Sequence, residues 1–274
     1  MSDRRLTPAN GRVAALHLQG HVAADAFVAG EKCNVQTAVA DLCASPNGSR
    51  DRQLLMGAAV TVFEDRNGWS FLQTEADGYV GYLRSDALGP RTVPSHFVST
   101  PATHVYESEA FKSRDLMVLS FGSKLTVTDE RAKFFETPYG YVPKKHLRPL
   151  ERPFADPVTI AQLFFGVPYL WGGNSVRGID CSGLVQAALM SCGIYCPADS
   201  DMQRAETGAL LDDGARLARG DLMFWKGHVG MMVDEDVMIH ANAHHMAVVY
   251  EPIKDAIIRI KAQGDGDVLA RKRL

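Results

Sequence analysis

Long apolar runs and a strong net charge are both missing from this 274-residue sequence. No segment approaches the roughly 20 consecutive apolar residues that a membrane-spanning helix needs, so we expect no membrane partner. The formal net charge is only −3, and a chain this close to neutral gives no reason to expect a nucleic-acid partner. The longest basic cluster, Arg271-Lys272-Arg273, is interpreted as a solvated chain end.

Cysteine is also scarce, and its pattern excludes two common uses. The five cysteines are an odd number, so they cannot all form disulfides within the chain. Their spacing matches no zinc-binding pattern, and we expect neither a metal nor another cofactor. The N-terminal residues lack the unbroken apolar core of a secretory signal. Together these features predict a protein of the reducing cytoplasm, while the oligomeric state is not indicated.

The remaining composition, with 46% hydrophobic and 22% charged residues, is that of an ordinary globular protein. A chain of this length can form two or three domains. Residues 1–34 show weak periodicity and are interpreted as an N-terminal extension without an assigned role. The segment from residue 151 to residue 274 mixes helical and strand-like patterns and is expected to form an α+β domain. Its first helix is expected to begin at Asp156-Pro157, because proline suits the first helical turn.

Between these two parts, short strand-like runs alternate with turn residues. The pattern is repeated: Ser49-Arg50-Asp51 leads to a glycine and an alternating strand, and Ser113-Arg114-Asp115 leads to the same sequence of features. We therefore expect two small β-barrels in tandem, at residues 35–95 and 96–150.

A glycine-rich loop leads into a predicted helix at Cys181. Apolar residues recur at helical spacing from there until Gly193. Asp180 occupies the position of a helix N-cap, so Cys181 lies in the first turn. Unpaired N–H groups and the positive end of the helix dipole favour a thiolate at such a place. A cysteine beside a helix start is more often a packed small residue, so a catalytic role requires partners.

Two histidines on neighbouring strands supply such partners. Strands are expected at 228–233 and 237–241, joined by a turn centred near Asp234. His228 lies six residues before this centre and His240 six residues after it, so the two are expected to face each other across an antiparallel pair. One imidazole can then orient the other.

These three residues have the elements of a cysteine-hydrolase triad. Cys181 is the expected nucleophile, His228 the base and then the acid, and His240 the residue that fixes the tautomer of His228. The alternative for each histidine is a structural hydrogen-bonding residue. A metal site built from the three side chains is disfavoured because no second cysteine lies two to four residues from Cys181.

In this order, the motifs resemble the NlpC/P60 cysteine peptidases, the papain-like cell-wall endopeptidases. The matching segments are Asp180-Cys181-Ser182-Gly183-Leu184, Arg219-Gly220-Asp221-Leu222, Gly227-His228-Val229-Gly230 and Ile239-His240-Ala241. The preceding Gly-Tyr strands, above all Asp77-Gly78-Tyr79-Val80-Gly81-Tyr82, resemble bacterial SH3 domains. The resemblance implies an α+β fold, with a papain-like NlpC/P60 catalytic domain at residues 151–274 preceded by two small SH3-like β-barrels.

The resemblance also implies roles for residues around the nucleophile. Tyr169 is expected beside the oxyanion site, together with the backbone N–H of Cys181, and Trp171 is expected to form a wall of the pocket. Other matching positions are expected to hold the amine and the D-glutamyl group of the substrate, namely Asp180, Ser182, Asp199 and Ser200. The alternative for each of them is a plain cap or loop residue.

The first SH3-like module is expected to take part as well. The whole chain resembles the subgroup of γ-D-glutamyl-L-diamino-acid endopeptidases, in which a tyrosine of this module closes the pocket. Tyr79 matches that tyrosine by its position in the Asp-Gly-Tyr turn. An acidic partner is also expected on the module. Asp51 is one option, and the loop near Cys43 and Ala44 is another, although it offers no acid.

These features predict a cysteine endopeptidase that cleaves the γ-D-glutamyl-L-diamino acid bond of murein peptides with a free N-terminal L-Ala, inside the cell, in murein recycling. Two alternatives stay open. An amidase or acyltransferase on the same fold would keep the triad but accept a substrate without a free amino end. A non-catalytic protein that binds peptide or glycan would give Cys181 an ordinary thiol pKa. The preferred diamino acid is not indicated.

Overall fold

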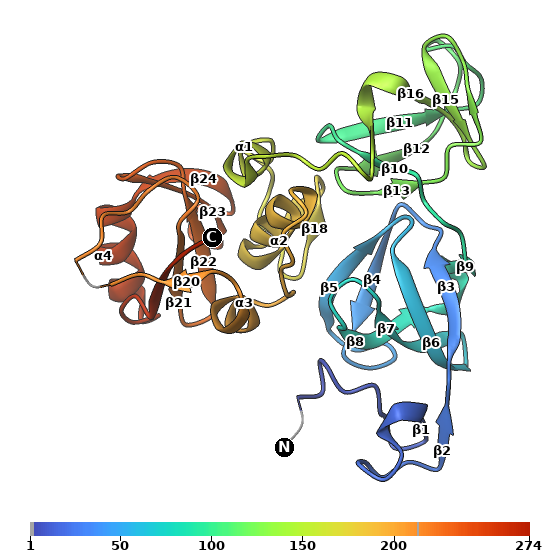
Figure 1. The fold of residues 1–274 in the computed structure, drawn as a ribbon, viewed down its shortest axis with the longest axis horizontal. Helices are drawn as coiled ribbons and strands as arrows, with labels where there is room; N and C mark the ends of the chain where they lie inside the picture. Colours follow the sequence, from blue (N-terminus) through green and yellow to red (C-terminus); the bar gives the residue numbers. More distant parts are fainter. Residues whose placement is uncertain (1–2, 213) are drawn as a thin grey trace. The chain divides into compact units, whose positions relative to one another are not determined.

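The computed structural model describes residues 3–212 and 214–274 (Figure 1). The contacts within the chain divide it into two compact units, Met1–Leu150 and Glu151–Leu274, called here the N-terminal and the C-terminal unit. Among the described residues, no helix has both the length and the apolar character needed to cross a membrane.

The first residues of the N-terminal unit pack on the sheet that follows them. Strands β1 (Val13–Ala15) and β2 (Ala26–Val28) form a parallel pair. The carbonyl of Arg5 accepts a hydrogen bond of 2.7 Å from the N–H of Val80, and Arg12 Nε donates to Glu64 Oε1 at 2.8 Å. The expected extension is therefore attached to the first barrel by backbone and side-chain contacts.

The first barrel is a sheet of seven strands in the order β5-β4-β8-β7-β6-β3-β9. Its strands are β3 (Glu31–Val35), β4 (Val39–Cys43), β5 (Arg50–Leu55), β6 (Ala59–Arg66), β7 (Trp69–Thr74), β8 (Val80–Arg84) and β9 (Leu88–Pro90). Because β3 pairs with both β6 and β9, the sheet begins before the boundary expected at residue 35, and that boundary is wrong. The polar residues at the start of β3 lack the alternation that identifies a strand in sequence.

The second barrel repeats this arrangement with one strand divided in two. Its sheets have the orders β12-β11-β16-β15-β14 and β13-β10-β17. The strands are β10 (His96–Val98), β11 (Ala102–Tyr106), β12 (Asp115–Ser120), β13 (Lys124–Leu125), β14 (Asp129–Glu130), β15 (Phe134–Thr137), β16 (Gly140–Pro143) and β17 (Leu147–Pro149). Strands β13 and β14 together take the place that the continuous β6 holds in the first barrel, so the repeat seen in the sequence is a repeat of topology.

Gly57 lies where the two barrels meet. It has a φ of +79°, and a Cβ atom there would lie 2.2 Å from the carbonyl oxygen of Lys124. Its neighbour Met56 is 1% exposed and packs in the core of the second barrel with Val98 and Leu119. Only glycine permits this close approach with that backbone conformation, so the two barrels share a packed boundary.

The C-terminal unit is α+β. Its sheet has the order β20-β25-β21-β22-β23-β24. The strands are β20 (Ala209–Leu210), β21 (Leu222–Trp225), β22 (His228–Met232), β23 (Val237–Asn242), β24 (Ala247–Pro252) and β25 (Ala270–Arg273), and the helices are α1 (Pro157–Gln162), α2 (Cys181–Ser191), α3 (Ser200–Glu206) and α4 (Ile253–Gln263). The hairpin of β18 (Asn174–Ser175) and β19 (Gly178–Ile179) precedes α2. The sheet lies between α4 on one side and α1 and α2 on the other (Figure 1).

The basic C-terminal residues form a strand of this sheet. Strand β25 pairs with β20 on one side and β21 on the other. Arg273 donates two hydrogen bonds to the carboxylate of Asp221, which is 1% exposed, and Lys272 is 8% exposed. The interpretation of this cluster as a solvated end is therefore wrong for Lys272, whereas the side chain of Arg273 is still 46% exposed. A buried carboxylate and two neighbouring strands accommodate charges that sequence alone places in solvent.

Candidate active site

Asp180 shapes the turn that presents Cys181. As predicted, it is the N-cap of α2, and its side chain accepts a hydrogen bond of 2.7 Å from the N–H of Gly183. It also accepts from the N–H of Gly172 at 2.9 Å and from the hydroxyl of Ser182 at 3.1 Å. The carboxylate thus joins the glycine-rich loop to the first turn of the helix, which is the structural alternative weighed for this residue.

Cys181 is the first residue of α2 and is 7% exposed. Its Sγ donates a weak hydrogen bond, 3.9 Å long, to the carbonyl oxygen of Gly227, and the backbone N–H of Val229 is near enough to lower the pKa of the thiol. The sulfur therefore lies against the backbone on both sides of His228. No hydrogen bond joins Sγ to the imidazole of His228 in the part of the chain that the structure describes. Catalytic hydrogen bonds are often loose until a substrate is bound.

The resting state of this sulfur differs from the expectation. Burial, followed by the charge of Asp180, raises the pKa of the Cys181 thiol from 9.0 to about 12. The N–H groups of Val229, Ser182 and Cys181 itself lower the pKa, but they do not outweigh burial. The prediction that the helix N-terminus favours a thiolate is therefore wrong for the resting protein. Cys181 holds its proton and needs a base to remove it.

The two histidines lie on neighbouring strands, but not directly opposite each other. Met231 pairs with Ile239 and Met232 with Met238, which centres the turn on residue 235 rather than on Asp234. The prediction of directly opposed histidines is therefore wrong. His228 and His240 are diagonal neighbours on the same face, and His228 Nε2 lies 2.8 Å from His240 Nδ1. The contact is made despite the shifted register because imidazole rings can span the diagonal.

His240 continues this chain of contacts toward α4. It is fully buried, and its Nε2 lies 2.9 Å from Glu251 Oε2 on β24. Arg259 on α4 donates to both oxygens of Glu251, from Nε at 2.8 Å and from a terminal nitrogen at 2.7 Å. Glu251 and Arg259 are not predicted from the sequence, because neither β24 nor α4 is predicted. An acid and an arginine eight residues apart give no specific signal in a single sequence.

Burial dominates the electrostatics of the histidine pair. Burial, then His240 and Arg259, lower the pKa of His228 from 6.5 to about 3, against an opposing effect of Glu251. The pKa of His240 is also lowered, chiefly by burial. Both imidazoles are thus neutral near pH 7, and His228 is able to accept a proton.

Acidification is expected to destabilise the C-terminal unit through His228. The unfolded chain protonates this residue near pH 6.5, whereas the folded state protonates it only near pH 3. The stability that neutral His228 contributes is therefore complete above pH 6.5 and is lost as the pH falls toward 3, with a limiting slope of about 1.4 kcal/mol per pH unit for one proton. Urea unfolding between pH 7 and pH 4 measures this slope. His228→Gln should give a shallower one, and equal slopes would contradict the assignment.

Tyr169 lies beside the nucleophile. Its backbone forms a parallel bridge with Ile179, and its N–H donates to the carbonyl of Met246 at 2.9 Å. Burial, then the charges of Cys181 and Asp180, raise the pKa of the Tyr169 hydroxyl above its ordinary value, so it remains a hydrogen-bond donor. Trp171, two residues on, is 68% exposed.

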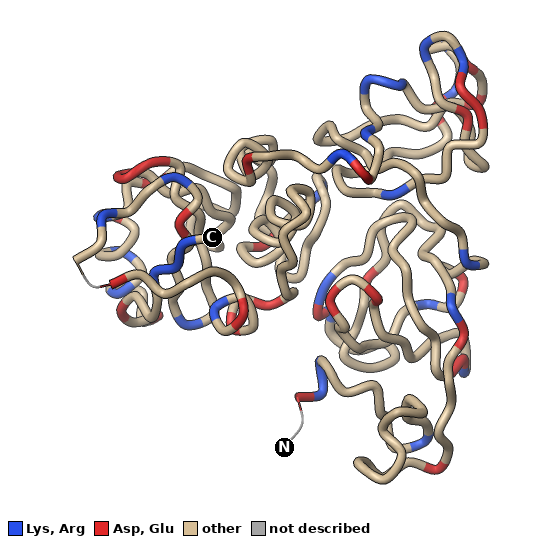
Figure 2. Tube along the Cα trace, viewed as in Figure 1, with Lys and Arg blue, Asp and Glu red and all other residues tan. Residues whose placement is uncertain are grey.

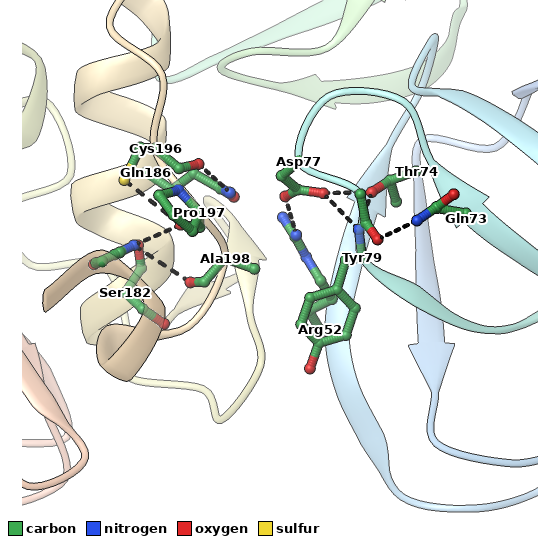
Figure 3. Close-up of polar contacts among 12 residues, drawn as sticks. Arg52, Gln73, Thr74, Asp77, Tyr79, Ser182, Gln186, Cys196, Pro197 and Ala198 are labelled. Carbon is green, nitrogen blue, oxygen red and sulfur yellow. Dashed lines mark hydrogen bonds and ion pairs between the residues drawn. The ribbon is translucent and has the colours of Figure 1, made fainter. Parts of the chain in front are cut away.

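Ser182 and the start of α3 are held by a glutamine that is also not predicted from the sequence. Gln203 is fully buried, and its Nε2 donates to the carbonyl of Ser182 at 2.9 Å and to that of Pro197 at 3.0 Å. Figure 3 shows Ser182, Pro197 and Ala198 close together near the start of α2. Asp199 is the N-cap residue of α3 but does not cap it with its side chain, and Ser200 begins the helix. The contacts bring Asp199 and Ser200 to the same end of the C-terminal unit as Ser182.

Tyr79 lies in a polar cluster of the N-terminal unit (Figure 3). It is 2% exposed, and its N–H donates to Thr74 Oγ1 at 2.9 Å. Asp77 accepts from the hydroxyl of Thr74 and forms an ion pair with Arg52, whose guanidinium lies 5.4 Å from the centre of the Tyr79 ring. The cluster fixes the turn that carries Tyr79.

Asp51, the acid considered for this module, already has a cationic partner. Arg4 donates to both of its carboxylate oxygens, at 2.9 and 3.2 Å. The other option, the loop near Cys43 and Ala44, has no acidic residue at these two positions that could act as the expected partner.

Charges of both signs are distributed over the two units. Figure 2 shows Lys and Arg interspersed with Asp and Glu within each unit. Within residues 3–212 and 214–274, no three His, Cys, Asp or Glu side chains are grouped so that they could hold a metal ion.

Comparison with known proteins places both parts of the chain. The sequence profile of the NlpC/P60 family matches residues 166–263, and that of the bacterial dipeptidyl-peptidase SH3 domain matches residues 42–88. A solved NlpC/P60 family protein from Bacillus cereus has the same fold, with a TM-score of 0.74 and 22% identity over 89% of this chain and 99% of that chain.

Two relatives carry the same printed name, gamma-D-glutamyl-L-lysine dipeptidyl-peptidase. The protein from Bacillus subtilis is 30% identical over 217 residues, which cover 69% of this chain and 71% of that protein. The protein from Bacillus cereus is 27% identical over 237 residues, which cover 74% of this chain and 70% of that protein. The chain therefore belongs to the NlpC/P60 family of cysteine peptidases and carries SH3-like barrels in front of its papain-like catalytic domain.

Proposed function

We propose that this peptidase hydrolyses the γ-D-glutamyl-L-diamino acid bond of murein peptides with a free N-terminal L-Ala. The observation that carries the chemistry is the buried thiol of Cys181 beside the hydrogen-bonded pair of His228 and His240. The substrate class is supported by the two relatives named gamma-D-glutamyl-L-lysine dipeptidyl-peptidase, which match over most of their length.

The proposed reaction is an acyl transfer through the sulfur of Cys181. His228 takes the proton from Sγ as the sulfur attacks the γ-carbonyl carbon of D-glutamate. The backbone N–H of Cys181 and the hydroxyl of Tyr169 stabilise the oxyanion. Collapse of this intermediate breaks the C–N bond, and His228 gives its proton to the departing amine. A water molecule, activated by His228, then hydrolyses the thioester and restores the thiol.

Further residues are proposed to bind and select the substrate. Ser182, Asp199 and Ser200 lie near one end of α2 and are proposed to hold the D-glutamyl group and the amine, and Trp171 is proposed to form a wall beside them. Asp180 has a smaller part in this proposal, because its carboxylate is engaged by the loop and the helix cap. The restriction to free amino ends is proposed to depend on Tyr79 of the first barrel.

The cellular task is proposed to be the recycling of murein peptides in the cytoplasm. All five cysteines are free, which is typical of proteins in reducing compartments. Cell fractionation tests the location, and recovery of the protein from outside the cytoplasm would overturn the recycling role while leaving the chemistry intact.

The proposed function is tested with L-Ala-γ-D-Glu-diaminopimelate and its N-acetylated form. We expect the protein to cleave the peptide with the free amine and to leave the acetylated peptide intact. Product formation is measured by chromatography, with Cys181→Ala as the inactive control. Equal cleavage of both peptides would keep the triad but discard selection of the amino end. Cleavage of neither would favour an acyltransferase or a non-catalytic binding protein.

A further inference from the structure

We propose that Glu251 is a positioning residue that sets the tautomers of both active-site histidines. The proposal rests on the assignment of His228 as the base in the proposed function. The residues concerned contact His240 or its partner Glu251, and they lie where β23, β24 and α4 meet.

His240 Nε2 has two competing neighbours. Glu251 Oε2 lies 2.9 Å from it and Asn242 Nδ2 lies 3.0 Å from it. The carboxylate can only accept a proton, whereas the amide nitrogen can only donate one. The orientation of the Asn242 amide is fixed, because its Oδ1 accepts the backbone N–H of His245 at 2.8 Å. Nε2 therefore either donates to Glu251 or accepts from Asn242.

The hydrogen bond to Glu251 is the stronger of the two, because an ionised acceptor roughly doubles the strength of a hydrogen bond. Burial alone would raise the pKa of Glu251, but Arg259 and His240 hold it well below its usual range, so the group is ionised near neutral pH. Nε2 of His240 therefore carries the proton.

This choice is transmitted to the nucleophile. With the proton on Nε2, Nδ1 of His240 is a bare acceptor, and it lies 2.8 Å from His228 Nε2. His228 must then carry its own proton on Nε2 to form that bond, which leaves His228 Nδ1 as the atom that can accept the proton of Cys181. If Nε2 of His240 instead accepted from Asn242, His240 would carry its proton on Nδ1 and donate it to Nε2 of His228. His228 would then carry its own proton on Nδ1, and no lone pair would be left there to accept the proton of the Cys181 thiol.

Arg259 keeps the carboxylate in place. It contacts both oxygens of Glu251 and is itself held by Gln263, whose Oε1 accepts from Arg259 at 2.7 Å. The planar guanidinium of arginine donates two hydrogen bonds to one carboxylate, one to each oxygen, a geometry that the single ammonium of lysine does not match. The titratable and charged groups near His240 are thus Glu251 on β24, Arg259 on α4, His245 in the loop after β23, and His228 on β22.

The first test measures the tautomers directly in the unliganded full-length protein. Long-range ¹H–¹⁵N NMR spectra near pH 7 should show His228 and His240 both protonated on Nε2. A spectrum with the His240 proton on Nδ1 would overturn the proposal. This result does not depend on any substrate, so failure of the proposed function and failure of this inference give different outcomes.

The second test is Glu251→Gln. Arg259 is expected to donate to the single amide oxygen of the new side chain, so that its amide nitrogen faces His240 Nε2. This nitrogen can only donate, so the proton of His240 is expected to move from Nε2 to Nδ1. We expect kcat for the free-amine peptide to fall by about 10- to 100-fold with little change in KM, together with a shift of the His240 proton to Nδ1 in the NMR spectrum. An unchanged kcat in a folded variant would overturn the proposal.

Two further variants separate positioning from general destabilisation. Asp267→Asn removes an exposed ion pair, 2.7 Å long, between Asp267 in the segment after α4 and Lys261 on α4, and should leave kcat and both tautomers unchanged. Adding Asn242→Asp to Glu251→Gln returns a carboxylate to the neighbourhood of His240 Nε2 and should recover part of the lost kcat. A purely structural role for Glu251 predicts no recovery, because the second substitution adds another buried acid.

Discussion

Cys181→Ala is expected to lower kcat for peptide hydrolysis by at least about 10⁴-fold, because loss of a nucleophile removes the covalent pathway as a whole. The alanine side chain fits the space that the buried cysteine leaves, so the fold should be kept. Rates are measured with the free-amine peptide, and circular dichroism verifies the fold.

The matched control for this prediction is Cys192→Ala. Cys192 follows the last turn of α2 and is half-buried, so it has the same chemistry at the opposite end of the same helix. Its substitution should leave kcat within a factor of about two, since a residue that lies away from the reacting atoms contributes no stabilisation of the transition state. Loss of activity in Cys192→Ala but not in Cys181→Ala would show that Cys192, and not Cys181, is the nucleophile.

His228→Ala is expected to lower kcat by roughly 10³- to 10⁴-fold, which is comparable to the loss of a base in other nucleophilic enzymes. The effect should be large because the Cys181 thiol, with its pKa raised to about 12, has almost no thiolate of its own near neutral pH. A cysteine with a low pKa would tolerate this change much better.

Chemical rescue distinguishes a missing base from a damaged site. The substitution leaves space beside Cys181, and added imidazole should restore part of the activity of His228→Ala, with a dependence on the concentration of the neutral form. His17→Ala is the control, because His17 is exposed and belongs to the N-terminal unit, outside the catalytic domain. Retention of a tenth or more of the wild-type kcat by His228→Ala would contradict the role as base.

Local signals in the sequence were sufficient for the parts of the site that depend on chain-neighbouring residues. The N-cap at Asp180, the helix at Cys181 and the helix start at Pro157 are set by hydrogen bonds within a few residues, and the structure confirms each of them. The α+β class and the tandem barrels followed from periodicity and from the repeated pattern, and they too are confirmed.

The failures concern quantities that depend on residues far apart in sequence. The turn is centred one residue later than predicted, which shifts the pairing register by two residues, because the bend after β22 contains two aspartates, Asp234 and Asp236, that both suit a turn. The pKa of Cys181 is set by burial that distant strands produce, so the helix dipole alone gave the wrong sign. Glu251 and Arg259 carried no motif and became visible only when β24 and α4 were in place.

The position of β25 has a consequence for how the chain acquires its structure during synthesis. Residues 270–273 insert between β20 and β21, so the edge of β21 has no partner until they have been translated and have left the ribosome. The barrels, which come first, are able to fold while this happens, because domains generally fold as units in the order of synthesis. The nascent chain thus completes the catalytic sheet last, after the strands that carry His228 and His240 have been synthesised.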